Sequence, residues 1–313
     1  MSPGSPRVSV GLPVYNGASF LQVSIDSILG QTFEDLELVI SDNASTDETQ
    51  RICEEAAARD PRVQYSRNES NLGPHFNFNR VFEMSRGEFF KWASHDDWVS
   101  PRYLEKCVAA ADRDPLVVLA YGQMCRVDAE LNTRVMVHHP EPIGRSRHPA
   151  VRLHDALWDL PYHPIFGLFR SSALRNTRGL MNKPEPDRIL LAEVALQGRF
   201  AQIPEVTLFQ RSSPRKDTWV WLDPNNRARP FLNTFRAAKA LFETLGASEE
   251  LDIVDKVLAV PDVLSYVLVG RIRGKLRQYR RRLRIGWARG AELDPAKVDL
   301  IVADLLEQEA RGS

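Results

Sequence analysis

The chain has 313 residues, of which 43% are hydrophobic and 26% charged, the composition of an ordinary globular protein with a sizeable core. Lys and Arg together number 41, as do Asp and Glu, so the overall charge favours neither a nucleic-acid nor a membrane partner. The three cysteines are widely spaced, the N-terminus lacks the apolar core of a signal peptide, and no apolar run reaches transmembrane length. These features favour a cytoplasmic protein.

In the first half of the chain, short apolar runs alternate with amphipathic stretches, which is typical of an α/β fold with a mostly parallel sheet flanked by helices. Strands are expected at residues 8–13, 36–40, 63–67, 88–93 and 117–122. Helices are expected at 21–29, 45–59 and 76–84, and from Ser100-Pro101 onward. Two of these helices have start signals: Ser45-Thr46-Asp47-Glu48 forms a capping box, and Ser100 precedes a proline at the first helical position.

The second half is less regular. Residues 132–164 show no clear periodicity, and their scattered histidines lack metal-ligand spacing. A helix is expected at about 187–197 and a strand at 200–210, followed by a turn-rich segment at 212–230 and a helical region from about 231 onward.

Two adjacent carboxylates, Asp96 and Asp97, follow the apolar run at 88–93. Neighbouring carboxylates repel one another unless a cation or hydrogen-bond donors lie between them. Mg²⁺ or Mn²⁺ with a bound phosphate would fit, because such ions take one or two carboxylates and fill the remaining positions with substrate oxygens. The alternative is a solvated turn that caps the helix after Pro101, and the pair alone does not decide between the two.

Polar or turn residues follow each of the first four expected strands, at Asn16, Asp42, Asn71 to Gly73, and Asp96-Asp97. Open α/β sheets bind ligands at the carboxyl ends of their strands, so this array indicates a nucleotide site. No glycine-rich dinucleotide or P-loop motif follows the first strand, which argues against those two chemistries.

At these residues the sequence resembles the inverting glycosyltransferases of family 2, which have a GT-A-type fold. The motifs that match in order and spacing are Val10-Gly11-Leu12-Pro13-Val14-Tyr15-Asn16, Ile28-Leu29-Gly30-Gln31-Thr32-Phe33, the run from Glu37 to Asp47, Asn71-Leu72-Gly73, and the run from Arg86 to Trp98. The resemblance covers roughly residues 7–210, about two-thirds of the chain.

The resemblance implies a domain organisation and an activity. Residues 1–230 would form the catalytic domain, with a nucleotide-sugar half at about 1–125 and an acceptor half at about 126–230, and residues 231–313 a helical C-terminal region. The activity would be transfer of a sugar from a nucleotide-diphosphate sugar to an acceptor hydroxyl, in the synthesis of a glycan, polysaccharide or glycolipid.

The resemblance also implies roles for residues of the nucleotide-sugar half. Those expected to bind the nucleotide sugar are Pro13, Tyr15, Asn16, Asp42, Asn71, Gly73 and Asp96. Asp42 would accept a hydrogen bond from the base, although a local turn before the capping box is the alternative role for this carboxylate. Asp97, with Asp96, would hold a divalent metal, Mn²⁺ or Mg²⁺, that neutralises the diphosphate.

Inversion requires a base that deprotonates the acceptor hydroxyl. The family takes it from an acidic motif at the start of a later helix, which matches Asp187 in this chain. A carboxylate at a helix N-terminus is expected to be held ionised. The alternative is that Asp187 only caps the helix.

Three positions depart from the family pattern. Ser94 and Pro186 stand where members often have acids, although Glu185 lies one residue before Pro186. The segment Arg211-Ser212-Ser213 lacks a histidine that members often have and that contacts the metal or diphosphate. Arg211, Arg215 or Lys216 could bind the diphosphate instead, or be solvated charges.

The segment Phe166-Gly167-Leu168-Phe169-Arg170 resembles the part of the family that lines the acceptor side. Its glycine would let a sugar approach the backbone closely, whereas its aromatic rings could equally belong to the core. We expect Phe169 in the core and leave Phe166 open.

Beyond residue 263, an apolar stripe with helical spacing runs from Leu264 to Trp287, and the segment from Arg271 to Arg284 carries eight basic residues and no acid. Packing on the catalytic domain or on a second subunit is the favoured interpretation. Peripheral contact with an anionic inner membrane face, which would suit a lipid-linked acceptor, is the alternative. For the whole chain, the alternative to an enzyme is a non-catalytic nucleotide- or sugar-binding module on the same fold.

Overall fold

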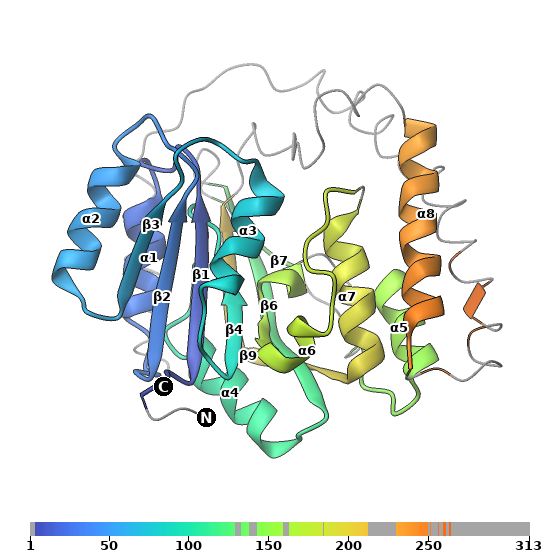
Figure 1. Cartoon of the computed structure of the whole chain (residues 1–313). Coiled ribbons are helices and arrows are strands. Elements are labelled where there is room, and N and C mark those ends of the chain that lie inside the picture. Colours follow the sequence, from blue (N-terminus) through green and yellow to red (C-terminus); the bar gives the residue numbers. More distant parts are fainter. Residues whose placement is uncertain are drawn as a thin grey trace.

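The computed structural model describes residues 4–128, 133–137, 143–158, 163–183, 185–211 and 230–249, together with residues 251, 256, 259, 260 and 263. Nine strands in these residues form one mixed sheet in the order β3-β2-β1-β4-β8-β6-β9-β5, with β7 paired to β6 (Figure 1). The expectations that lie outside the described residues include the turn-rich segment 212–230 except for its last residue, Arg215 and Lys216 within it, the stripe 264–287 and the basic segment 271–284. None of the described helices is long and apolar enough to cross a membrane.

The first half of the chain forms the parallel part of the sheet, as the sequence predicted. Every residue of β1 and β2 is buried, which is typical of parallel strands covered by helices on both faces. The strands are β1 (Val8–Val14), β2 (Leu36–Asp42), β3 (Val63–Arg67) and β4 (Phe89–Trp92). The helices are α1 (Leu21–Leu29), α2 (Thr49–Arg59) and α3 (Pro74–Glu83).

The second half adds both parallel and antiparallel pairs. Its strands are β5 (Trp98–Val99), β6 (Val117–Asp128), β7 (Thr133–Val137), β8 (Leu168–Arg170) and β9 (Arg199–Arg211). Its helices are α4 (Tyr103–Arg113), α5 (Pro149–Trp158), the 3₁₀ helix η1 (His163–Phe166), α6 (Ser171–Arg175), α7 (Pro186–Gln197) and α8 (Pro230–Ala247).

Two hydrophobic cores meet at α7. Leu190, Leu191 and Val194 belong to the main core of the sheet and its helices. Ile189 and Leu196 belong to a second core, which α5 and α8 build with α7. In Figure 1, α7 accordingly stands between the sheet and the pair α5 and α8. A helix packed on two sides is apolar around most of its circumference, as α7 is.

Two helix starts differ from the sequence prediction. Helix α2 begins at Thr49, because Ser45 Oγ accepts a hydrogen bond from the backbone of Asn16 and does not cap the helix. Helix α4 begins at Tyr103, and Ser100 Oγ accepts instead from the backbone N–H of Thr207 on β9. Both hydroxyls therefore tie distant segments together. The region 132–164 also contains β7 and α5, which the sequence did not predict.

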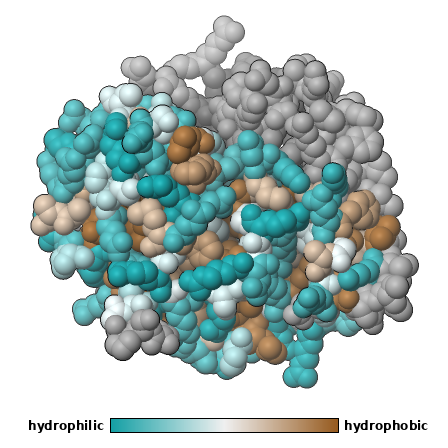
Figure 2. Space-filling model, in the orientation of Figure 1, coloured by the Kyte–Doolittle hydropathy of each residue, from teal (hydrophilic) through white to brown (hydrophobic). Residues whose placement is uncertain are grey.

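The surface in Figure 2 is mostly hydrophilic, with hydrophobic residues in small separate patches on the described part of this face. All three cysteines are buried and form no disulfide. Burial raises the pKa of Cys53 and of Cys107 to about 12, which fits inert core thiols.

Candidate active site

Strands β1, β2 and β3 end at paired residues, whereas β4 ends at Trp92, opposite Gly11 of β1. Val14 at the end of β1 pairs with Asp42 at the end of β2, and Asp42 pairs with Arg67 at the end of β3. The residues that follow these strands therefore share one edge of the sheet, as predicted. Hydrogen bonds join the loops directly: the backbone N–H of Asn16 donates to Ser45 Oγ at 2.9 Å.

Asp42 is fully buried, and both of its carboxylate oxygens have partners in the chain. Oδ1 accepts from the backbone N–H of Ser45 at 2.9 Å. Oδ2 accepts from the Tyr65 hydroxyl at 3.2 Å and lies 3.2 Å from Arg67 Nε in a salt bridge. Burial, with the charge of Asp42, raises the pKa of Tyr65, so its hydroxyl stays a donor. The local turn considered for Asp42 is present, and Tyr65 and Arg67 are site residues that the sequence did not indicate.

Three residues expected at the nucleotide lie in or just after β1. Pro13 is buried within the strand, whereas Tyr15 is 45% exposed at this edge. Asn16 adopts a left-handed backbone conformation with φ 51°, which asparagine tolerates better than most residues. Its Oδ1 accepts a hydrogen bond from the backbone N–H of Thr46 at 2.8 Å. Asn16 thus fixes the loop after β2, and Tyr15 presents an exposed aromatic ring beside it.

A network of asparagines joins the loops after β2 and β3 to α3. Asn43 Nδ2 donates to Asn71 Oδ1 at 2.8 Å and to the Gly73 carbonyl at 3.2 Å. Asn68 Nδ2 donates to Asn43 Oδ1 at 3.0 Å and to Asn77 Oδ1 at 3.3 Å. Asn71 and Gly73 were expected here, but the other three asparagines were not. The sequence signal that could have indicated this network is Asn77, which stands between two phenylalanines in α3. The structure shows that Asn77 is buried, and a buried amide must find hydrogen-bond partners.

The acid pair lies between β4 and β5 and belongs to no helix cap. Asp97 is only 4% exposed, and its Oδ1 accepts from the backbone N–H of Arg211 at 3.1 Å. Asp96 is partly exposed, and its Oδ1 accepts a hydrogen bond from Ser94 Oγ. Ser94, which replaces an acid of the family pattern, is therefore a donor to the remaining pair. The antiparallel pairing of Trp98 with Phe209 brings Asp97 beside Arg211.

Arg211 places a buried positive charge next to this acid pair. Its guanidinium carbon lies 4.0 Å from the centre of the Phe20 ring and 5.4 Å from that of Trp98, a cation–π arrangement. Its Nε donates to the backbone carbonyl of Asp96 at 3.3 Å. Of the three basic residues considered for the diphosphate, Arg211 is the one among the described residues.

The described residues contain no cluster of three or more His, Cys, Asp or Glu side chains that could enclose a metal ion. Two adjacent carboxylates fit an ion that takes most of its ligands from a diphosphate and water. They do not form a closed protein cage. The donor set therefore fits Mg²⁺ or Mn²⁺ carried with the substrate, and Asp96 and Asp97 would hold it.

Helix α7 brings Asp187 to the same edge of the sheet. Strand β9 runs parallel to β6, and α7 leads into its start, so the N-terminus of α7 lies on the side where β6 and β9 end. Asp187 is the second residue of α7, and no side-chain cap hydrogen bond is found at this helix start. The N-cap residue is Glu185, so Asp187 is not the N-cap itself, and its carboxylate belongs to the first turn of the helix.

The environment of Asp187 opposes ionisation. Asp187 is partly exposed, but desolvation by the surrounding protein, with a smaller effect from the charge of Glu185, raises its pKa to about 7, and Arg188 opposes the shift. The expectation that the helix N-terminus keeps this carboxylate fully ionised is therefore wrong, because desolvation is the larger effect. Glu185 adopts a left-handed conformation with φ 56° directly before Pro186. That position normally favours extended backbone, so the start of α7 is strained.

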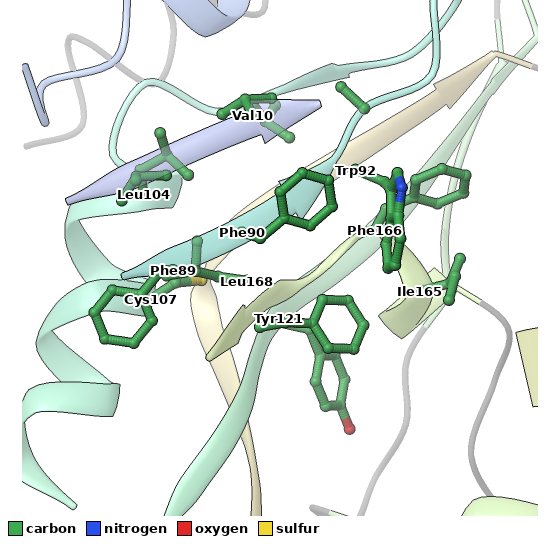
Figure 3. Packing of buried hydrophobic residues seen from close by; sticks show 14 of the residues in the cluster. Val10, Phe89, Phe90, Trp92, Leu104, Cys107, Tyr121, Ile165, Phe166 and Leu168 are labelled. Atoms are coloured by element: carbon green, nitrogen blue, oxygen red, sulfur yellow. The ribbon is translucent and has the colours of Figure 1, made fainter. Parts of the chain in front are cut away.

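The expected acceptor segment belongs to the core. Phe166 and Phe169 are both buried, and Figure 3 shows Phe166 beside Trp92 of β4. A Cβ on Gly167 would lie 2.7 Å from Leu119 Cδ1, so packing against β6 requires this glycine. The buried Lys91 donates from Nζ to the Phe166 carbonyl, and burial lowers the pKa of Lys91 to about 8. The segment therefore positions β4 and β8, and these side chains line no open surface.

Comparisons with known proteins agree with this architecture. The model of the family described as Glycosyl transferase family 2 matches residues 9–178, more than half of the chain. An uncharacterized glycosyltransferase of Haemophilus influenzae is 28% identical over 229 residues, which are 71% of this chain and 70% of that protein. The chondroitin synthase of Escherichia coli is 32% identical over 127 residues, which are 41% of this chain but only 18% of the synthase.

Two solved structures share the fold. TarS of S. aureus (residues 1–349), in complex with UDP-GlcNAc, has a TM-score of 0.65 at 19% identity, over 83% of this chain and 72% of that one. The mannosyltransferase PcManGT of Pyrobaculum calidifontis, with GDP-Man and Mn²⁺, has a TM-score of 0.52 at 18% identity, over 98% of this chain and 87% of that one. Both likenesses confirm the α/β fold of GT-A type. Because the family model matches more than half of its length, the chain belongs to glycosyl transferase family 2 and is a glycosyltransferase.

Proposed function

We propose that this enzyme transfers a sugar from a nucleotide-diphosphate sugar to an acceptor hydroxyl with inversion at the anomeric carbon, and that Asp187 is the base. The observation that carries this proposal is the position of Asp187 together with its raised pKa. It lies at the sheet edge where the strands end, makes no hydrogen bond to a described residue, and has a pKa of about 7. A carboxylate that no described residue engages in a hydrogen bond, and whose pKa is near neutrality, suits proton transfer.

The reaction is a single displacement. The acceptor oxygen attacks the anomeric carbon while its proton passes to an oxygen of Asp187. The bond between the anomeric carbon and the diphosphate oxygen breaks, and the diphosphate leaves with that electron pair. Because attack and departure occur on opposite faces of the sugar, the configuration inverts.

The donor nucleotide is proposed to lie over the loops after β1, β2 and β3. Tyr15 offers an exposed ring for stacking, and Arg67, whose side chain is 35% exposed, offers donors beside the buried Asp42. Asn16, Asn71 and Gly73 would shape this pocket through the hydrogen bonds between loops. Pro13 would contribute as a rigid residue of β1, since its ring is buried.

The diphosphate is proposed to contact a divalent metal that Asp97 and Asp96 hold. The presence of Mn²⁺ in the structure of PcManGT supports a divalent metal at this site. When bound, the metal neutralises the charge that develops on the leaving diphosphate. Arg211 adds a fixed positive charge behind the acid pair. We further propose that the acceptor is a carbohydrate or a lipid-linked glycan.

A panel of sugar nucleotides tests the donor and metal assignments. Thermal unfolding is followed with UDP- and GDP-linked sugars, each with Mn²⁺, with Mg²⁺ or with EDTA. We expect one donor to raise Tm by several degrees only when metal is present. A donor that stabilises equally in EDTA would contradict the metal assignment.

The anomeric configuration of the product tests the mechanism. With the donor that the panel identifies, the one-bond carbon–proton coupling at the new linkage reports the configuration by NMR. Inversion relative to the donor is expected. Retention would rule out the single displacement and the role of Asp187 together.

A further inference from the structure

The segment that leads to α7 includes the stretch from Arg178 to Leu180. This stretch forms hydrogen bonds with α3 and with α8, two helices from distant parts of the sequence. From there the chain runs through Lys183 to the strained Glu185 and then to Asp187. A strained backbone persists only where the surrounding structure fixes it firmly. The contacts of this stretch with its neighbours therefore bear on the position at which α7 begins.

On one side, α3 clamps the stretch through Asn79. Its Oδ1 accepts from the backbone N–H of Leu180 at 2.9 Å, and its Nδ2 donates to the carbonyl of the same residue at 2.9 Å. Gly179 has φ 66°, and a Cβ there would lie 2.8 Å from Asn79 Oδ1. One amide thus satisfies both backbone groups of Leu180, and glycine is required for the close approach.

On the other side, α7 and α8 hold the stretch through Arg178. Its Nε donates to Glu193 Oε1 at 2.6 Å, and its backbone N–H donates to Glu193 Oε2 at 3.0 Å. Its Nη1 donates to Glu243 on α8 at 3.0 Å, and Glu243 also pairs with Lys183 at 3.5 Å. Because Glu193 is buried and accepts several hydrogen bonds, its contacts with Arg178 are more rigid than the exposed ion pairs of Glu243.

Helix α3 also reaches the nucleotide edge. Two residues before Asn79, the buried Asn77 donates from Nδ2 to the Ser41 carbonyl at 2.8 Å and joins the asparagine network. One helix therefore contacts both the loops proposed for the donor and the segment that carries the proposed base.

We propose that Asn79 and Arg178 are positioning residues for Asp187. They hold the entry to α7 between α3 and α8 and so fix the carboxylate relative to the donor edge. This inference rests on the proposed role of Asp187 as the base and gives α8 a part in the active site. Neither residue is among those proposed above to bind the donor or the metal.

The test measures transfer with the donor identified above for Asn79→Ala, Arg178→Gln and Arg178→Lys, with Asp187→Asn alongside. Asn176→Ala is the matched control, because this exposed asparagine lies in the same loop and none of its side-chain atoms forms a described hydrogen bond. A misplacement of about 1 Å can lower a rate by roughly 100-fold, so we expect kcat to fall by about 10- to 100-fold in Asn79→Ala and Arg178→Gln. The KM for donor should stay within about twofold, since Asn77 and the nucleotide loops are unchanged.

The pH profile separates positioning from general destabilisation. Moving Asp187 into a different environment should shift the midpoint of the kcat profile away from about 7, which thermal destabilisation alone would not do. Arg178→Lys, which retains the charge but not the planar fork, should give an intermediate loss. If folded Asn79→Ala and Arg178→Gln keep both kcat and the midpoint while Asp187→Asn is inactive, the positioning role is wrong. If Asp187→Asn remains active, the proposed base is wrong instead.

Discussion

Asp187 links activity and stability at the level of a single residue. In the unfolded chain its carboxyl ionises near pH 4, whereas in the folded protein its pKa is about 7, so the folded state binds more protons between these values. The free energy of unfolding therefore falls as the pH rises from about 4 to 7, and the ionised carboxylate destabilises the fold above pH 7. The same raised pKa that would suit the proposed base therefore destabilises the fold once the carboxyl ionises.

Replacing the carboxyl group of Asp187 with a neutral amide should restore the free energy of unfolding that is lost above pH 7. Asp187→Asn is expected to raise the free energy of unfolding at pH 8 by roughly 2 kcal/mol, allowing for partial solvent screening, and to change it little at pH 4.5. Urea denaturation at the two pH values measures the difference. The exposed Asp26→Asn serves as the matched surface control for the same chemical change. Equal effects of Asp187→Asn at both pH values would contradict the raised pKa.

The acid pair can be tested without loss of the fold. In Asp97→Asn, Oδ1 can still accept the hydrogen bond from the backbone N–H of Arg211, so the loop between β4 and β5 is preserved. Only the negative charge is lost. We expect Mn²⁺ affinity in the presence of donor to fall by roughly 100-fold, measured by calorimetric titration. Asp96→Asn, at the more exposed position, should have a smaller effect. Unchanged affinity in both variants would exclude the pair as metal ligands.

At the level of elements, the sequence predicted the parallel strands and their helices well. Buried strands such as β1 and β2 consist mostly of apolar or small residues, so their pattern is clear from local residues even though β2 also contains Glu37 and Asp42. Helix-start signals were misleading where a side chain forms its hydrogen bond with a residue far away in the sequence. Ser45 and Ser100 resemble caps, but their hydroxyls accept from Asn16 and Thr207.

The same limit applies to the candidate site. The array at the strand ends could be predicted, because parallel pairing places successive strand ends at one edge. The partners of Asp42 could not, since Tyr65 and Arg67 reach it only through the register of β2 and β3. The pKa of Asp187 depends on burial by surrounding elements, which no local pattern encodes.

Helix α3 depends on the asparagine network for its docking. Asn77 is 3% exposed and bonds to the backbone of β2 and to Asn68, so Asn77→Ala leaves several buried groups without partners. We expect a loss of about 2–4 kcal/mol in the free energy of unfolding and weaker donor binding, measured by urea denaturation and by calorimetry. Asn176→Ala is again the matched control. A loss below about 0.5 kcal/mol would show that the network does not dock α3.

For the whole molecule, α7 joins the sheet to the helical layer of α5 and α8. Leu241 on α8 is 2% exposed in the second core, so Leu241→Ala should cost about 2–4 kcal/mol. Because α7 contributes to both cores, unfolding should remain a single transition in circular dichroism and in tryptophan fluorescence. Two separated transitions, with only the first one shifted by Leu241→Ala, would show that α8 unfolds independently of the catalytic core.

The most direct test of the proposed enzyme is the turnover of Asp187→Asn at saturating donor and acceptor, measured at pH 8, where the wild-type carboxylate is ionised. Removal of the base should lower kcat by at least about 100-fold, the low end of the contribution of general base catalysis. Donor affinity should not change, because Asp187 lies outside the nucleotide loops. A kcat within tenfold of the wild-type value, with donor bound equally well, would contradict the assignment of Asp187 as the base.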